Sequence, residues 1–250
     1  MTLQLDNIRV VKGYAEILRG ISLTLLPGRF TALCGPNGAG KTTALNVITG
    51  AIKQTSGSAS LDGQAIQGMN TQELARRRAV VSQQSLLTFP FEVHEVVAMG
   101  RAPHFGKTTP VHDLHVVGEA LALMELTELA ERRYTTLSGG ERQRVQIARA
   151  LAQVWGEPEG GSDRWLMLDE PTAALDLKHQ IALMKLLEEL AKKGWGIAAV
   201  LHDLHLVKDH ADDVVLFKDG AIAATGAAEE LLTADRIATV FDLSEPYSLA

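Results

Sequence analysis

The sequence predicts an α/β fold, and three observations lead to this class. An apolar stretch at 30–34 predicts a buried strand, residues 35–43 form a glycine-rich loop, and residues 43–48 predict a helix that ends before Gly50. Further along the chain, short apolar strands at 165–168 and 197–201 alternate with segments of helical periodicity. This alternation is typical of α/β proteins, in which helices connect the strands of a largely parallel sheet.

The glycine-rich loop fits the pattern G-x-x-x-x-G-K-(S/T), in the strand-loop-helix context that the pattern requires. Residues without bulky side chains let backbone N–H groups approach phosphate oxygens, and the helix N-terminus adds its positive end. Lys41 would contact the β- and γ-phosphates and Thr42 would offer a hydroxyl to Mg²⁺. The alternative is a glycine-rich turn without a ligand. We expect a nucleoside triphosphate to contact Gly35, Pro36, Asn37, Gly38, Ala39, Gly40, Lys41, Thr42 and Thr43.

Composition narrows the possible classes of protein. With 250 residues, 46% hydrophobic and 22% charged, the chain can form one large domain or two small ones. A net charge of −6 argues against a protein that mainly coats nucleic acid. The single cysteine, Cys34, excludes an internal disulfide, fits a reducing compartment and is best interpreted as a small buried core residue.

The sequence contains no recognisable targeting or membrane-spanning segment. Residues 1–6 lack the basic and apolar regions of a secretory signal, and no window approaches 18 uninterrupted apolar residues. If the protein works at a membrane, we therefore expect another chain to hold it there.

Before the phosphate loop, residues 3–10 and 21–26 alternate apolar and polar side chains as half-buried strands do. Tyr14 lies between them and could be a surface residue or stack on an adenine ring. After the loop we expect a strand and turn at 57–63, a helix at 71–78 with three arginines at a solvated end, and a buried strand at 79–82 that leads to Gln83.

From 88 to 153 helical periodicity dominates, and an exposed loop is expected at 156–163. A second helix is expected from about 140 to 152. Farther on, a helix at about 181–193 should end at Gly194, the strand 197–201 leads to His202, and 214–217 with 221–223 predict a hairpin. Within 88–153, the first of the two expected helices is indicated by apolar residues at helical spacing, namely Leu114, Val117, Leu121 and Met124.

Two carboxylates, Asp169 and Glu170, follow the apolar strand 165–168. A carboxylate suits a hard cation, so Asp169 can hold Mg²⁺, directly or through water. Glu170 is suited to polarise the water that attacks the γ-phosphate. The alternative is an acidic cap before Pro171, but with a phosphate loop in the same chain we favour catalysis.

Residues 137–141 read Leu-Ser-Gly-Gly-Glu and precede a basic helix. Physically, this is either a capped helix start or a second anion-binding turn with a hydroxyl, two glycine N–H groups and a helix N-terminus. The string resembles the signature of the ATP-binding cassette (ABC) ATPases. In that family it faces the γ-phosphate bound by the other subunit, so the resemblance implies that Ser138, Gly139 and Gly140 complete a site on a second copy.

The resemblance extends over essentially the whole chain, with the motifs in family order. It implies that Tyr14 stacks on adenine, that Gln83, or the adjacent Gln84, touches Mg²⁺ and the attacking water, and that His202 contacts the γ-phosphate. Asp176 matches the loop that crosses the dimer interface. Thr42-Thr43 stands where the family often has Ser-Thr, which preserves the hydroxyl.

The fold implied is that of a P-loop NTPase of the ABC ATPase type, with a RecA-like core, an antiparallel β subdomain and a helical subdomain. We expect a single ABC ATP-binding domain over 1–250, with the core and β subdomain at 1–86 and 160–250 and the helical subdomain at about 87–159. The implied cofactors are ATP and Mg²⁺.

The implied assembly is a homodimer of ATPase subunits on two copies of an integral-membrane permease, at the cytoplasmic face of the inner membrane. A periplasmic substrate-binding protein would act indirectly, and no nucleic acid is expected. Residues 87–101 are candidates for the permease contact; the alternative is an ordinary solvated helix surface.

Within the family, the sequence is similar to importer ATPases of the vitamin B12, siderophore and haem group, through 89–91, 99–104 and 202–204. The 156–163 loop and residues 175–180 resemble haem importers in particular. The sequence therefore predicts an ATPase that energises haem uptake. The alternatives are a siderophore or cobalamin importer, a lone exporter cassette, and a non-transport ABC ATPase acting on nucleic acid.

Overall fold

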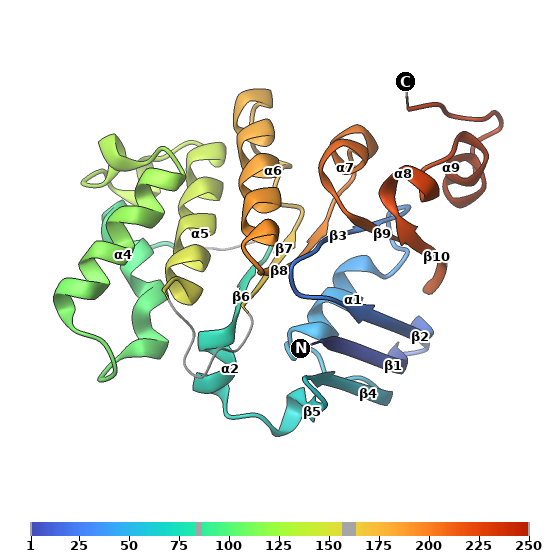
Figure 1. Cartoon of the computed structure of the whole chain (residues 1–250), viewed down its shortest axis with the longest axis horizontal. Helices are drawn as coiled ribbons and strands as arrows, with labels where there is room; N and C mark the ends of the chain where they lie inside the picture. Colours follow the sequence, from blue (N-terminus) through green and yellow to red (C-terminus); the bar gives the residue numbers. More distant parts are fainter. Residues whose placement is uncertain (1, 84–86, 157–163, 250) are drawn as a thin grey trace. The chain divides into compact units, whose positions relative to one another are not determined.

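The computed structural model describes residues 2–83, 87–156 and 164–249 (Figure 1). Two compact units make up the chain: unit 1 consists of Met1–Met69 and Met184–Ala250, and unit 2 of Asn70–Leu183. Unit 1 thus contains both ends of the chain, and unit 2 is one continuous segment. Gln84 and all of the predicted 156–163 loop except Gly156 lie outside the described residues.

An antiparallel sheet in unit 1 has the strand order β2-β1-β4-β5. Leu3 of the central strand β1 lies opposite Leu25 of β2 and Leu61 of β4, so three buried leucines form one row across the sheet. The second strand begins at Ala15, well before the predicted start at 21, because its first half, which includes the buried Leu18, also pairs with β1. The strand bounds are β1 Leu3–Lys12, β2 Ala15–Leu25, β4 Ser56–Leu61 and β5 Gln64–Ala65.

The other strands of unit 1 are arranged in the order β10-β9-β3-β8. Strand β3 pairs in parallel with β8 on one side and β9 on the other, and β9 pairs antiparallel with β10 as the predicted hairpin. Every residue of β3 and β8 is buried, as expected for parallel strands covered on both faces. The bounds are β3 Phe30–Cys34, β8 Gly196–Val200, β9 Asp213–Lys218 and β10 Ala221–Ala227.

Short helices follow several of these strands, and the division between the units falls within the longer helix α6, Leu177–Lys192. This helix buries Met184, Leu187 and Leu190 and is followed by Gly194 at a φ of 92°, as its sequence predicts. The remaining helical segments of unit 1 are α1 Lys41–Ile48, η1 Ile66–Gly68, α7 Leu204–His210, α8 Ala228–Leu231 and α9 Ala234–Phe241.

Unit 2 contains the parallel strand pair β6 (Arg78–Val81) and β7 (Trp165–Asp169) and a set of helices. The segment after 88 is helical as predicted, and its helices α4 and α5 pack against each other. Within the described part of the chain, no helix is long and apolar enough to cross a membrane. The helical segments are α2 Thr71–Arg77, α3 Val93–Ala98, η2 Met99–His104, α4 Pro110–Leu123, η3 Thr127–Leu129, η4 Tyr134–Thr136 and α5 Gly139–Val154.

Two expectations about side chains in unit 2 were wrong. Leu114, interpreted as part of the buried stripe of α4, is 69% exposed, although Val117 and Leu121 are buried. Arg76 and Arg77 lie in the last turn of α2 as expected, but Arg78 already belongs to β6, where burial lowers its pKa to about 10. Arg76 is half-buried and donates to the carbonyl of Pro103 at 3.2 Å. Helical periodicity in the sequence does not indicate that a strand begins at Arg78.

Candidate functional site

The glycine-rich loop of unit 1 is closed around the side chain of Lys41. Its Nζ donates hydrogen bonds of 2.8 Å to the carbonyl oxygens of Gly35 and Pro36, and the residue is only 6% exposed. These contacts fold the side chain back over the loop between β3 and α1. A buried cation held at the N-terminus of a helix is well placed to meet an anion.

Two glycines are required by the space around this loop. Gly35 has a φ of 143°, and a Cβ there would lie 2.2 Å from the carbonyl oxygen of Phe217. Gly40, the residue before α1, has a φ of 100°, and a Cβ would lie 2.7 Å from Leu18. The conformation and the close packing both exclude a larger residue. Thr42 and Thr43 then enter the first turn of α1, beside the predicted phosphate position.

Cys34 ends β3 directly before the loop and is completely buried. Burial raises the pKa of its thiol to about 12, although the positive charge of Lys41 acts in the opposite direction. The thiol is therefore protonated at physiological pH and has little nucleophilic character. This agrees with its interpretation as a core residue.

His202 lies at the same edge of the parallel strands as the glycine-rich loop. Leu33 of β3 pairs with Val200 of β8, so the loop and His202 both follow the carboxyl ends of adjacent parallel strands. This is the edge at which open α/β sheets bind ligands. The next residue, Asp203, caps α7 by accepting hydrogen bonds from the backbone N–H groups of His205 (2.9 Å) and Leu206 (3.2 Å).

Tyr14 is fully exposed at the turn between β1 and β2. An exposed ring is available for stacking, but the same exposure fits an ordinary surface residue. Its predicted contact with adenine stays a prediction.

In unit 2, the structure brings Gln83 and Glu170 together. Val81 pairs with Leu168, so both residues follow the carboxyl ends of neighbouring parallel strands. Gln83 Nε2 donates a hydrogen bond of 2.8 Å to Glu170 Oε2. The contact joins residues that are 87 positions apart and orients the carboxylate that the sequence assigns to catalysis.

Asp169 and Glu170 have different surroundings although they are adjacent. Asp169 is the last residue of β7 and is 5% exposed. Glu170 adopts a left-handed backbone with a φ of 50°, which is uncommon for a residue with a side chain. The strand end thus separates one buried carboxylate from one that turns toward Gln83.

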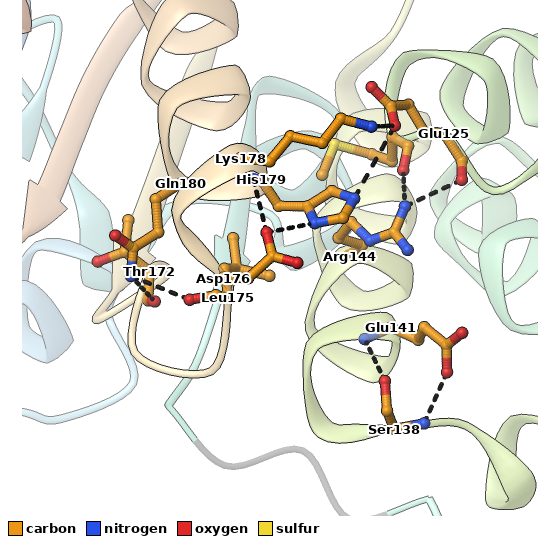
Figure 2. A network of polar contacts seen from close by, with 11 residues as sticks. Glu125, Ser138, Glu141, Arg144, Thr172, Leu175, Asp176, Lys178, His179 and Gln180 are labelled. Atoms are coloured by element: carbon orange, nitrogen blue, oxygen red, sulfur yellow. Dashed lines mark hydrogen bonds and ion pairs between the residues drawn. The ribbon is translucent and has the colours of Figure 1, made fainter.

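The turn at Ser138 opens α5 with a capping box, shown in Figure 2. Ser138 Oγ accepts from the backbone N–H of Glu141 at 3.2 Å, and Glu141 Oε2 accepts from the backbone N–H of Ser138 at 2.7 Å. The second hydrogen bond lowers the pKa of Glu141 below its ordinary value. Gly139 has open space around it, whereas a Cβ on Gly140 would lie 2.9 Å from the carbonyl oxygen of Ala174. The capped-start and anion-turn interpretations are therefore compatible.

Asp176 precedes α6 and is engaged by a residue that sequence reasoning missed. Its Oδ1 accepts from the backbone N–H of His179 at 2.9 Å and lies 2.7 Å from His179 Nδ1 (Figure 2). An acidic residue before a helix, with a donor three positions later, is a capping pattern that the sequence could have revealed. The predicted direct role of Asp176 at a nucleotide is not tested by these contacts.

The donor set predicted for Mg²⁺ consists of hard oxygen ligands: the Thr42 hydroxyl, the Gln83 amide oxygen and the Asp169 carboxylate. Because Gln83 Nε2 donates to Glu170, its oxygen remains the atom for a cation. Such ligands, few in number and combined with phosphate oxygens, fit Mg²⁺. No group of three or more His, Cys, Asp or Glu able to hold a metal occurs among the described residues.

The segment 99–104, interpreted above as a mark of an importer subgroup, packs against the C-terminal end of α5. Gly100 allows close contact, since a Cβ would lie 2.3 Å from the carbonyl of Arg149. Arg101 Nη1 donates to the carbonyl of Ala152 at 2.7 Å, and His104 Nε2 lies 2.8 Å from that of Gln153. These contacts satisfy carbonyls at the end of the helix that Ser138 opens.

Comparison with known proteins gives consistent matches. The ABC transporter family profile matches residues 18–173. Two curated relatives are both named hemin import ATP-binding protein HmuV. The one from Gloeobacter violaceus is 45% identical over 227 residues, 91% of this chain and 82% of the relative. The one from Hahella chejuensis is 44% identical over 236 residues, 94% of this chain and 91% of the relative.

Solved structures with the same fold include an ABC transporter assigned to the metal-chelate type, in an inward-facing conformation. It is 27% identical, with a TM-score of 0.78 over 96% of this chain and 89% of that chain. Another is the ATP-binding cassette MJ0796 in a dimeric post-hydrolysis state bound to ADP and Pi. It is 28% identical, with a TM-score of 0.78 over 91% of this chain and 99% of that chain. Both have the fold that the sequence predicts.

Proposed function

The chain belongs to the ABC transporter family, and we propose that it is the ATP-hydrolysing subunit of an importer that moves haem through a partner permease. The main support for ATP hydrolysis is the hydrogen bond from Gln83 to Glu170, because it orients a carboxylate at the strand edge where a γ-phosphate would be attacked. The cargo is supported by the relatives named for hemin import, which are 45% and 44% identical along almost the whole chain.

Nucleotide binding is assigned to the loop 35–43, with Tyr14 stacking on the adenine ring. The loop carbonyls hold the Lys41 ammonium at the start of α1, where it can exchange these contacts for the β- and γ-phosphates. Thr42, Gln83 and Asp169 would hold Mg²⁺, which supplies charge neutralisation of the phosphates when it is bound. All other steps of ATP hydrolysis are assigned to side chains of this protein.

Hydrolysis is assigned to Glu170 as general base, taking a proton from the attacking water. Gln83 holds the Glu170 carboxylate by its amide N–H and can orient the same water through its oxygen. His202, which follows β8, is assigned to donate to a γ-phosphate oxygen and to respond when that phosphate leaves.

We propose that two copies close around two nucleotides. Ser138 and Gly139 are exposed at the start of α5, so their hydroxyl and N–H groups can face a nucleotide bound by a second copy, together with Gly140. Asp176 would cross between the two copies. The related cassette MJ0796, which is dimeric in a post-hydrolysis state bound to ADP and Pi, supports a dimer.

The importer role also implies partners and a location. Two ATPase subunits would dock on two permease subunits at the cytoplasmic face of the inner membrane, with a periplasmic binding protein delivering cargo. Residues 87–101 are proposed for the permease contact, and Phe89 there is 68% exposed. We assign 1–86 and 160–250 to the core and β subdomain, and about 87–159 to the helical subdomain.

One competing cargo has an observation in its favour. The similar transporter structure assigned to the metal-chelate type supports uptake of a ferric siderophore or another chelate. The relatives named for hemin import have much higher identity, so haem remains the proposed cargo.

Reconstitution separates these possibilities. The chain would be co-purified with its permease, placed in lipid vesicles with the binding protein, and assayed for ATP hydrolysis with haem, a ferric siderophore or cobalamin. We expect haem to give the largest stimulation, and none in a complex that carries Glu170→Gln. Stimulation by cobalamin or siderophore alone would reassign the cargo. Stimulation by nucleic acid without a permease would contradict the importer role.

A further inference from the structure

We infer that His179 is a positioning residue, which fixes Asp176 and connects its loop to helix α5 through Glu125 and Arg144. The inference rests on the proposed function, because it matters only if Ser138 and Asp176 both face a second copy. All residues involved belong to unit 2, and Figure 2 shows them together.

The first link joins His179 to Asp176. Asp176 Oδ1 accepts from the backbone N–H of His179 and also contacts its ring Nδ1, at 2.9 and 2.7 Å. An ionised carboxylate only accepts hydrogen bonds, so Nδ1 carries the proton. The side chain of His179 is 21% exposed and that of Asp176 is 68% exposed. The histidine is therefore the fixed support, and the carboxylate is the group presented outward.

The second link joins His179 to Glu125, at the end of α4. Glu125 Oε2 lies 3.9 Å from His179 Nε2 and accepts a hydrogen bond of 2.7 Å from Lys178 Nζ. The ring of His179 therefore lies between two carboxylates, Asp176 at its Nδ1 and Glu125 near its Nε2.

The third link joins Glu125 to α5 through the backbone. Glu125 has a left-handed φ of 51°, and its carbonyl accepts from Arg144 Nη1 at 2.9 Å. The same Nη1 donates to the carbonyl of Met124 at 2.8 Å, and Arg144 is buried. Glu125 is thus fixed to α5 by its main chain while its side chain holds α6.

The loop before Asp176 is also restrained at two other places. Gln180 Nε2 donates to the carbonyls of Thr172 and Leu175, at 3.1 and 3.0 Å. Gly140, in the first turn of α5, packs directly against Ala174. The backbone of the loop is therefore held by α6 and α5, while the direction of the Asp176 carboxylate depends on His179.

This arrangement sets the spacing between two groups that a second copy would contact. Ser138 lies at the start of α5, and Asp176 is connected to the same helix by His179, Glu125 and Arg144. None of the hydrogen bonds given above for this network involves the glycine-rich loop, which lies in unit 1. Loss of His179 should therefore weaken closure and turnover while nucleotide binding by one copy persists.

The test compares His179→Ala, which removes the ring, with His179→Asn, whose side-chain amide can still donate to Asp176. In the full-length chain we expect His179→Ala to lower kcat about 10-fold, within the range of coupled pairs, with little change in the KM for ATP. Combined with Glu170→Gln, it should raise the protein concentration needed for ATP-dependent dimerisation. His179→Asn should recover most of both losses. His115→Ala, at an exposed histidine facing Glu119 on α4, should leave both unchanged.

Rescue separates positioning from a merely structural role. The charged groups around the ring are Asp176, Glu125, Lys178 and Arg144. His179→Asn restores a donor to Asp176 without the ring, so recovery of kcat by this variant shows that the contact with Asp176 is what matters.

Several outcomes would overturn the inference. An unchanged kcat and unchanged dimerisation in His179→Ala would do so, as would a failure of His179→Asn to recover either loss. If His179→Ala unfolds, the kcat and dimerisation of His179→Asn still decide the question. If Glu170→Gln alone fails to dimerise with ATP, the proposed function fails first, independently of any His179 variant.

Discussion

The phosphate loop of unit 1 and the Ser138 turn of unit 2 are both glycine-containing starts of helices, but they differ in what surrounds them. In the first, Lys41 is buried and hydrogen-bonded to the loop itself, and Gly35 and Gly40 are closely packed. In the second, Ser138 and Gly139 are exposed. The first is packed within its own unit, whereas the second presents its groups outward. The proposed site shared between two copies requires this difference.

Removing the cation should break the first region completely. We expect Lys41→Ala to abolish ATP binding, because it removes the buried cation that is expected to meet the β- and γ-phosphates. Binding of a fluorescent ATP analogue would measure this, with Lys53→Ala, at an exposed lysine, as the control. Unchanged affinity in Lys41→Ala would contradict the assigned role.

Neutralising the catalytic carboxylate should separate binding from chemistry. We expect Glu170→Gln to keep ATP binding and to lose hydrolysis by about 10²–10⁴-fold, as for removal of a general base. An ATP-bound dimer should then accumulate, measured by size-exclusion chromatography with light scattering. Glu189→Gln, at an exposed position of α6, should hydrolyse ATP normally and not accumulate such a dimer. A strictly monomeric Glu170→Gln variant would exclude the shared site.

A smaller effect should distinguish the two glycines of the exposed turn. We expect Gly140→Ala to lower the free energy of unfolding by about 1–3 kcal/mol, because its Cβ would overlap the carbonyl of Ala174. Gly139→Ala has open space and should melt like wild type. Any loss of ATP-dependent dimerisation in Gly139→Ala would then report on the interface itself. Equal melting of the two variants would show that the Gly140 packing does not matter.

The features predicted correctly were those set by neighbouring residues. The glycine-rich loop, the apolar strand before Asp169 and the capped start of α5 each depend on a few consecutive positions, so a pattern is enough to identify them. The errors arose where a longer-range partner decided the outcome. The first half of β2 was not predicted as a strand, yet it pairs with β1, and Arg78 leaves a helical pattern to join β6 beside β7.

The sequence by itself determined that this chain has a phosphate loop, a strand ending in two carboxylates and a second glycine turn, because local backbone preferences and side-chain chemistry suffice for these. Only the tertiary structure decided which of the distant residues contact one another. Gln83 meets Glu170 because Val81 pairs with Leu168. Likewise, His179 reaches Glu125 because Arg144 holds the end of α4 against α5. Such pairs depend on strand register and helix packing between distant segments, which no local pattern encodes.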